Sequence, residues 1–365
     1  MKKRFLNCFS KPSILFLVIF IITSVLWGVA AFNPAFADFL VSTVGYAIRR
    51  VLSFVFSFTP FSLMEILFVL FIALIVIHAV FVLRRCKSRV KIISNIVSVF
   101  SVFALIISLY AFSLGIGYRK TSISQGLSLD TGVEINTETL YRTLNILKEE
   151  TEKTLGEVEF DASGASVCPH SLEKISEIIS DAYGIIDKKY PGLNLKNFNS
   201  KAKTAISGAI LTDLEILGIY SFYTGEATVN TKYPDYTLPF SVAHEFAHQR
   251  GISRENEANF MAFLACVNSG DAYITYSGYL NMFEYVAASL NKADERLTVE
   301  LYKTLDGRII QEMRRYSEFY YENKNEFLSD LSSFFNDKYL KLQGTEGVVS
   351  YGLVTRLCVA YYCEE

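Results

Sequence analysis

Three long apolar runs constrain this chain more than any other feature of its sequence. Residues 14–32, 61–83 and 92–117 carry almost no charged side chains, and an α-helix needs about 20 mainly apolar residues to cross a bilayer. Hydrophobic residues make up 51% of the chain, and their excess over a soluble enzyme lies within residues 1–117. We predict a membrane domain with three transmembrane helices there and one globular domain in residues 118–365.

Two basic segments define the expected orientation of these helices. Residues 2–4 and 84–91 are rich in lysine and arginine, and such segments stay on the cytoplasmic side of a membrane. Both lie inside if the first two runs cross the membrane and residues 39–58 do not. We therefore expect a multi-pass protein of the cell membrane with a cytoplasmic N-terminus and an extracytoplasmic domain at residues 118–365.

The stretch at residues 39–58 is apolar but interrupted by Arg49 and Arg50, which is typical of an amphipathic helix in the membrane interface. A cleavable signal peptide is the alternative interpretation of the first apolar run, because residues 35–37 resemble a small-x-small cleavage site. The run is longer than the apolar region of a usual signal peptide, and Pro34 lies within the would-be site. We favour an uncleaved anchor.

The chemistry of the chain centres on residues 244–248, which read His-Glu-Phe-Ala-His. On a helix, His244 and His248 share one face, one turn apart, so both imidazoles reach a single tetrahedral zinc ion. Glu245 then reaches the open coordination position, where it accepts a proton from an activated water and returns it to a leaving amine. The alternative is a pair of surface histidines, but this helix is small and apolar on nearly all sides and is expected to be buried.

A catalytic zinc site needs a third protein ligand. Gly251 can end the first helix in a left-handed conformation, and the next helix carries Glu255, Glu257 and Asn259. Glu255 and Asn259 share a face of that helix, whereas Glu257 points the other way. We predict Glu255 as the third zinc ligand, with Glu257 as the alternative, and Asn259 as a group that orients one histidine. Without a metal, Glu255 would still be favoured as an acid in the first turn of a helix.

Two tyrosines on the following predicted helix are candidate catalytic residues. Tyr276 and Tyr279 lie within one turn of each other, and a phenol near zinc stabilises the oxyanion formed during amide hydrolysis. The alternative for both is aromatic packing.

The remaining elements of the globular domain follow from hydrophobic periodicity. Residues 201–236 alternate short apolar stretches with turns, and residues 227–230 are the expected edge strand, to which a peptide substrate adds a further strand. Glu226, just before that strand, is either a cleft residue or an exposed acid of a turn. Helices are expected at residues 136–157, 170–190, 272–290, 299–321, 326–342 and 349–362.

The motifs resemble known proteins at two levels. His244, His248, Glu255 and Asn259 resemble the site of gluzincin metallopeptidases, which are thermolysin-like in their ligands. In that pattern an acid supports a histidine where this chain has Asn259, and the gap from His248 to Glu255 is shorter here. More of the chain resembles an uncharacterised family of bacterial multi-pass membrane proteins with a zincin-like domain. That resemblance implies a membrane-anchored metallopeptidase, and it lies in residues 27–28, 60–62, 115–119, 223–227, 244–260, 276–279 and 347–352.

These observations together predict a membrane-anchored zinc metallopeptidase. Its fold is expected to combine an α-helical membrane anchor with a mostly helical α+β, zincin-like domain that contains a small sheet. Its partners are a peptide or protein substrate, Zn²⁺ and the lipid bilayer. A net charge of −2 gives no indication of nucleic-acid binding, and the six cysteines have no CxxC spacing.

Two other classes of function remain open. A non-catalytic zinc-binding sensor or assembly protein at the cell surface would have a closed fourth coordination position, for example through Glu257 or His170. A transporter is disfavoured, because the three apolar runs include neither a broken helix nor matched repeats.

Overall fold

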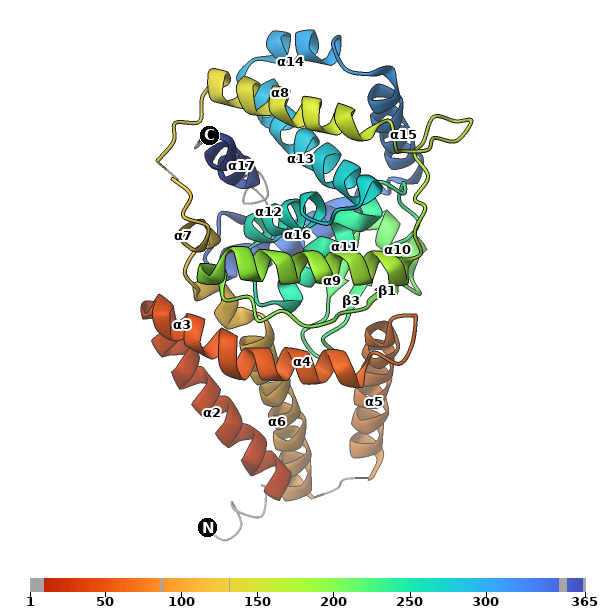
Figure 1. Ribbon diagram of the computed structural model, residues 1–365. Coiled ribbons are helices and arrows are strands. Elements are labelled where there is room, and N and C mark those ends of the chain that lie inside the picture. Colours follow the sequence, from red (N-terminus) through yellow and green to blue (C-terminus); the bar gives the residue numbers. More distant parts are fainter. Residues whose placement is uncertain (1–9, 86–87, 131, 348–352, 364–365) are drawn as a thin grey trace.

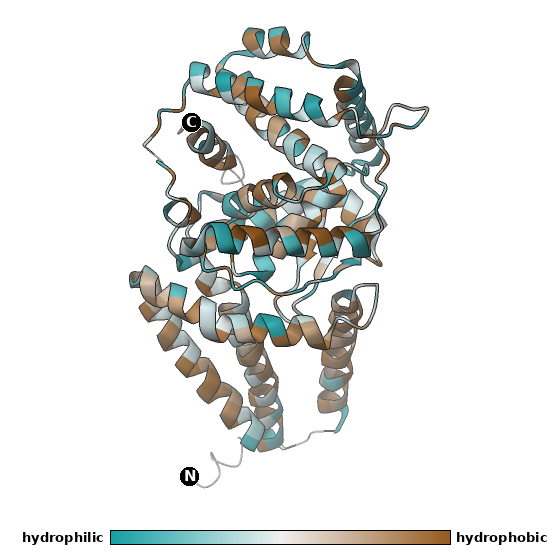
Figure 2. Cartoon of the chain, viewed as in Figure 1, coloured by the Kyte–Doolittle hydropathy of each residue, from teal (hydrophilic) through white to brown (hydrophobic). Residues whose placement is uncertain are grey.

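The computed structural model of this chain describes residues 10–85, 88–130, 132–347 and 353–363. Its described part is mostly helical, and three helices are long and apolar enough to cross a membrane. They extend together on one side of the globular half (Figure 1), and their outward faces are hydrophobic (Figure 2). The prediction of three helices of membrane length is confirmed, and these helices are α2 (Lys11–Phe32), α5 (Leu63–Arg85) and α6 (Arg89–Ser113).

The segment between the first two of these helices is itself helical. It consists of α3 (Pro34–Leu40), the single π-helical turn η1 (Val41–Gly45) and α4 (Tyr46–Val55). Together they lie across the ends of the long helices, next to the globular half (Figure 1). One side of the segment exposes large apolar side chains, whereas Arg49 on another side is buried. This arrangement is that of an amphipathic helix, and the exposed apolar residues are Phe39, Val44, Val51, Phe54 and Val55.

The globular half follows the short 3₁₀ turn η2 (Gly115–Arg119). The predicted helix over residues 299–321 is wrong, because the chain is interrupted there: α14 ends at Tyr302, and the side chain of Asp306 caps the start of α15. The first residues of the last predicted helix, 349–352, lie outside the described residues. The helices are α7 (Ile123–Gly126), α8 (Thr137–Thr154), α9 (Leu172–Lys189), α10 (Gly208–Asp213), α11 (Thr237–Gln249), α12 (Glu255–Val267), α13 (Ala272–Ala293), α14 (Glu295–Tyr302), α15 (Gly307–Asn323), α16 (Glu326–Leu342) and α17 (Val354–Cys363), with a 3₁₀ turn η3 (Pro191–Leu193).

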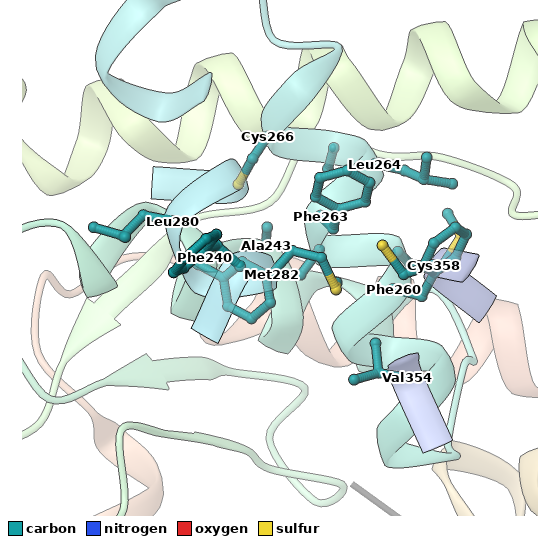
Figure 3. Packing of buried hydrophobic residues seen from close by; sticks show 14 of the residues in the cluster. Phe240, Ala243, Phe260, Phe263, Leu264, Cys266, Leu280, Met282, Val354 and Cys358 are labelled. Atoms are coloured by element: carbon teal, nitrogen blue, oxygen red, sulfur yellow. The ribbon is translucent and has the colours of Figure 1, made fainter. Parts of the chain in front are cut away.

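The hydrophobic core of the globular half surrounds α12. All residues from 257 to 266 are buried, which makes α12 the central helix, with α11, α13 and α17 packed around it. Figure 3 shows the side chains through which these helices meet, among them Phe240, Phe263, Met282 and Cys358. Each large apolar side chain buried in this way contributes about 1.5–3 kcal/mol, so α11 and α12 are held in a rigid relation to each other.

The small sheet has three strands, β1 (Ala202–Thr204), β2 (Gly218–Tyr220) and β3 (Ala227–Val229), in the order β1-β3-β2. β3 pairs in parallel with β1 and antiparallel with β2. The expected edge strand at residues 227–230 is therefore a central strand, because both of its edges are already paired. The outer edge of β1 is covered by Pro60 and Ser62, which exchange backbone hydrogen bonds with Thr204. Among the described residues, the outer edge of β2 pairs with no strand.

Glu226 joins the sheet to the start of the second long helix. Its carboxylate accepts the backbone N–H groups of Leu63 and Met64, at 3.0 and 2.7 Å, and lies 2.6 Å from Lys203 Nζ. A carboxylate at a helix N-terminus satisfies free N–H groups and complements the helix dipole. Glu226 is only 2% exposed, so it is neither a cleft residue nor an exposed acid of a turn.

Glu65 makes the reciprocal connection from the long helix to the globular half. Its carboxylate accepts the N–H groups of Ile206 and Ser207, at 2.9 and 2.7 Å, just before α10. α5 and the globular half are thus connected by charge-assisted hydrogen bonds, in addition to the chain itself.

Candidate metal centre

Three side chains from α11 and α12 meet at one point. His244 and His248 lie on one face of α11, which ends at Gln249, and Gly251 turns the chain with a φ of +84°. The next helix then begins at Glu255, beside the two histidines. The distances are 3.1 Å between the two Nε2 atoms, 3.3 Å from His244 Nε2 to Glu255 Oε2, and 3.7 Å from His248 Nε2 to the same oxygen. In the described part of the chain, no other three His, Cys, Asp or Glu side chains place their ligand atoms this close together.

These separations fit a tetrahedral zinc site. Zinc binds nitrogen and oxygen ligands at about 2.0–2.2 Å, so two ligand atoms of a tetrahedral ion lie about 3.4 Å apart. The three separations in this structure, 3.1, 3.3 and 3.7 Å, bracket that value. Two imidazoles and one carboxylate are a donor set that zinc takes in open sites, in which a fourth position remains for water or substrate.

Both histidines are held by their other ring nitrogen. His244 Nδ1 lies 2.7 Å from Asn259 Oδ1, and His248 Nδ1 lies 2.7 Å from the backbone oxygen of Ile252. Because both partners accept, each Nδ1 donates its proton to its partner, and each Nε2 points toward the centre, where its lone pair would bind a metal ion. This is how histidines are oriented for a metal, and Asn259 lies where we expected a residue that orients a histidine.

The electrostatics of the cluster favour a cation at its centre. Burial penalises the charge of Glu255, but His248 and hydrogen bonds from both histidines outweigh it and hold the pKa of Glu255 below its ordinary value. Burial likewise opposes a charge on His248, but Glu255 raises the pKa of His248 to about 9. The carboxylate therefore attracts positive charge to the point where the three ligand atoms meet, either as a proton or as a metal ion.

Glu245 lies beside the three ligands with one carboxylate oxygen unpaired. Its side chain is 4% exposed, and its Oε2 atom has no hydrogen-bond partner among the residues that the structure describes. Burial raises the pKa of Glu245, while His244 and His248 lower it. The other side of the carboxylate lies against β2: the N–H of Tyr220 donates to it, and a Cβ atom at Gly218 would lie 2.5 Å from Oε1. A buried carboxylate with a raised pKa and a free oxygen is suited to accept and return a proton.

A cavity of about 600 Å³ opens onto these four side chains. β2 forms one wall, and Asn281 and Tyr285 of α13 form another. The polar side of α16 also lines the cavity, together with Leu114, which follows α6, and Tyr118 of η2. The cavity thus adjoins the end of the third membrane-length helix.

The structure does not bring the two predicted catalytic tyrosines to this cavity. Tyr276 is fully buried and its hydroxyl donates to Glu312, 3.2 Å away, while Tyr279 packs within the aromatic core. Neither residue lines the cavity, because Asn281 and Tyr285 occupy the side of α13 that faces the metal centre. Tyr285 follows Tyr276 by two and a half turns and is therefore on the opposite side of the helix. Sequence spacing within α13 could not reveal which side faces α11.

The alternative ligands lie elsewhere. Glu257 accepts the N–H of Ile123 at 3.2 Å and pairs with Arg254 at 2.9 Å, so its carboxylate connects α12 to the segment that follows α6 and η2. His170 Nε2 lies 2.6 Å from Asp271. Neither residue is part of the group formed by the two α11 histidines and Glu255.

Comparison with known protein families places most of this chain in a family. A family model described as "Protein of unknown function (DUF3810)" matches residues 42–359. The matched region contains α4, the second and third membrane-length helices and every side chain of the candidate metal centre. Searches of curated proteins and of solved structures found no match.

Proposed function

This chain belongs to the DUF3810 family, described as proteins of unknown function, and we propose for it the activity of a membrane-anchored, zinc-dependent metallopeptidase. One observation carries the proposal: His244, His248 and Glu255 place three ligand atoms 3.1–3.7 Å apart, beside an unpaired carboxylate oxygen of Glu245. A metal site that only stabilised the fold would not need that fourth side chain.

The proposed chemistry divides between the zinc ion and the chain. Zinc would supply an activated water and polarise the carbonyl of a peptide bond. His244, His248 and Glu255 hold the ion, and Asn259 orients His244. Glu245 accepts the proton of the attacking water and then donates it to the leaving amine. Its burial keeps the proton transfer away from bulk solvent.

The outer edge of β2 supports a peptide or protein as the substrate. Residues 218–220 line the cavity, and among the described residues no strand covers their outer edge. A peptide that added a strand there would lie beside Glu245 and the metal ligands, held by backbone hydrogen bonds that depend little on sequence.

The alternative proposal is a zinc-binding sensor or assembly protein without catalysis. It would gain support from a fourth protein ligand, but Glu257 and His170 hydrogen-bond to other groups. The fourth coordination position, which these three ligands leave open beside Glu245, favours a catalytic zinc site over a non-catalytic one.

We further propose that residues 118–365 lie on the extracytoplasmic side of the cell membrane. The basic residues Arg84, Arg85 and Arg89 lie at the ends of α5 and α6 that are far from the globular half, where Figure 2 shows the hydrophilic ends of these helices. Basic residues stay on the cytoplasmic side, so the opposite ends and the globular half would be outside.

The test is the zinc content and peptide hydrolysis of the full-length protein in detergent. We expect one zinc ion per wild-type chain, loss of zinc in His244→Ala and Glu255→Gln, and retention of zinc in Glu257→Gln, which serves as the matched control. Glu245→Gln should retain zinc and lose hydrolysis. Full hydrolytic activity of zinc-loaded Glu245→Gln would refute the proposed peptidase mechanism. A well-folded wild type without zinc would refute the proposed metal site.

A further inference from the structure

Arg49 connects the amphipathic segment to the helix that carries the two histidines. It lies on α4, is only 2% exposed, and donates to three backbone carbonyls. Its Nε atom donates to Gln249 at 2.9 Å, Nη2 to Val41 at 2.9 Å, and Nη1 to Phe112 at 3.4 Å. The guanidinium has no carboxylate partner among these contacts, and its hydrogen bonds all go to carbonyl oxygens.

Two of the three carbonyls lie at the C-terminal ends of helices. Gln249 is the last residue of α11, and Phe112 is the penultimate residue of α6. Such carbonyls have no partner within their own helix and lie at the negative end of the helix dipole. A planar guanidinium with five donors satisfies several of them at once, which a lysine ammonium cannot do in the same geometry. Burial lowers the pKa of Arg49 to about 10, so the side chain remains charged at neutral pH.

The contact with Gln249 lies within a few residues of a metal ligand. A Cβ atom at Gly251 would lie 2.7 Å from Arg49 Nη2, so the guanidinium packs directly against the turn that follows α11. The next residue, Ile252, supplies the carbonyl that holds His248 Nδ1 at 2.7 Å. Arg49 is thus connected to the ring of His248 through the backbone of this turn.

The side chain of Gln249 connects the end of α11 to the loop before β3. Its Nε2 atom donates to the carbonyl of Gly225 at 2.7 Å, and a Cβ atom at Gly225 would lie 2.7 Å from the backbone nitrogen of Ser53 on α4. α4 is therefore in contact with the end of α11 and with the loop before β3. Little room remains for the turn to adopt another conformation.

We propose that Arg49 is a positioning residue for the metal centre, which holds the turn after α11 so that His248 faces the metal and thereby couples the membrane-associated segment to the active site. This inference rests on the proposed zinc site. It assigns to the segment between the first two long helices a role in metal binding, beyond attachment to the membrane.

The experiment compares zinc binding by full-length variants in detergent. Arg49→Lys keeps the positive charge but loses the planar set of five donors, and Arg49→Met removes the charge and the donors. If Arg49→Met does not fold, Arg49→Lys decides the outcome. Arg50→Met is the first control, because Arg50 is the exposed neighbour of Arg49 and donates to the hydroxyl of Tyr46 on its own helix. Lys203→Met is the second control, because Lys203 is equally buried but holds Glu226 and the loop before α5.

Three measurements separate positioning from general stabilisation. Zinc affinity is measured by competition with a chromophoric chelator, and the geometry of the site by the d–d absorption of bound Co²⁺. Hydrogen–deuterium exchange of the metal-free protein follows the amides of residues 251 and 252, which donate to His248 and Ala247.

Substitution of groups that orient a metal-binding histidine costs 10- to 100-fold in metal affinity. Because Arg49 acts through the intervening turn, we expect about a 10-fold weaker zinc affinity in Arg49→Lys, an altered Co²⁺ spectrum and faster exchange at residues 251 and 252. Arg50→Met should match the wild type, and Lys203→Met should lower the melting temperature without weakening zinc binding.

Wild-type zinc affinity and Co²⁺ spectrum in folded Arg49→Lys would overturn this inference and leave the proposed function intact. Equal losses of zinc affinity in Arg49→Lys and Lys203→Met would also overturn it, because the effect would then follow stability. A wild type that binds no zinc would instead overturn the proposed function, and this inference with it.

Discussion

Replacement of Gly218 by alanine should separate zinc binding from hydrolysis. Gly218 lies on β2 directly against Glu245, and an added Cβ atom would lie 2.5 Å from Oε1, 2.9 Å from Cγ and 3.0 Å from Cδ of that side chain. Ordinary contacts of a Cβ atom begin near 3.4 Å. Because Gly218 is paired with Val229 of the central strand, the strand is held in place, and the side chain of Glu245 has to move.

The size of that movement sets the expected loss of activity. Relief of the closest contact, from 2.5 to 3.4 Å, requires a shift of about 0.9 Å at Oε1. A misplacement of about 1 Å in a reacting group lowers the rate by about 100-fold, which corresponds to about 2.7 kcal/mol in activation free energy. The three atoms nearest the added methyl group all belong to Glu245, so zinc content should remain that of the wild type.

The assay uses a peptide that the wild type cleaves, identified by mass spectrometry after digestion of a peptide library. Its kcat/KM and the zinc content are then compared between Gly218→Ala and Gly307→Ala, a control position with no heavy atom within 4 Å of the added Cβ. Glu245→Asp shortens the carboxylate and makes room for the methyl group. If Gly218→Ala reduced activity as strongly in the Glu245→Asp background as in the wild type, a steric clash with Glu245 could not be the cause.

Three further predictions concern affinity, pH and orientation. Asn259→Leu removes the acceptor 2.7 Å from His244 Nδ1 and should weaken zinc binding by about 10- to 100-fold, whereas Asn281→Leu in the same cavity should not; equal affinities by chelator competition would contradict this. Burial raises the pKa of Glu284 from 4.5 to about 7, so its protonated form stabilises the fold below about pH 4.5, and this contribution is lost as the pH rises through 7. Glu284→Gln cannot ionise, so its free energy of unfolding should exceed that of the wild type by up to about 3 kcal/mol above pH 8 and match it near pH 4. A stability difference that does not depend on pH in thermal unfolding would count against this. Protease added outside right-side-out vesicles should digest residues 118–365, and protection of that domain would reverse the proposed orientation.

Local spacing explains which features could be predicted without the tertiary structure. Length and polarity alone identify helices that can cross a membrane, and the three long helices agree with the apolar runs to within a few residues. An i, i+4 pair lies on one face of any α-helix, so the proximity of His244 and His248 follows once the helix forms. The choice of Glu255 over Glu257 used the same periodicity, and the structure brings Glu255 to the two histidines.

Features that depend on packing between distant segments could not be predicted in the same way. Residues 227–230 read as an edge strand, but pairing with β1 and β2 makes them central, and the free edge belongs to β2. The spacing of Tyr276 and Tyr279 indicated a shared region of one helix, yet the side of α13 that meets the cavity carries Tyr285. Nothing local distinguishes these alternatives, because each depends on which surface a neighbouring element covers.

Arg49 and the two histidines differ in how far apart in the sequence their contacts lie. The sequence by itself determined the membrane-length helices, the paired histidines and the glutamate beside them, because each depends on residues within one or two turns of a helix. Only the tertiary structure decided that Arg49, 200 positions before Gln249, would meet the carbonyl at the end of the helix that carries the two histidines. Periodicity describes the faces of a helix, whereas the partner of each face is selected by the packing of the whole chain.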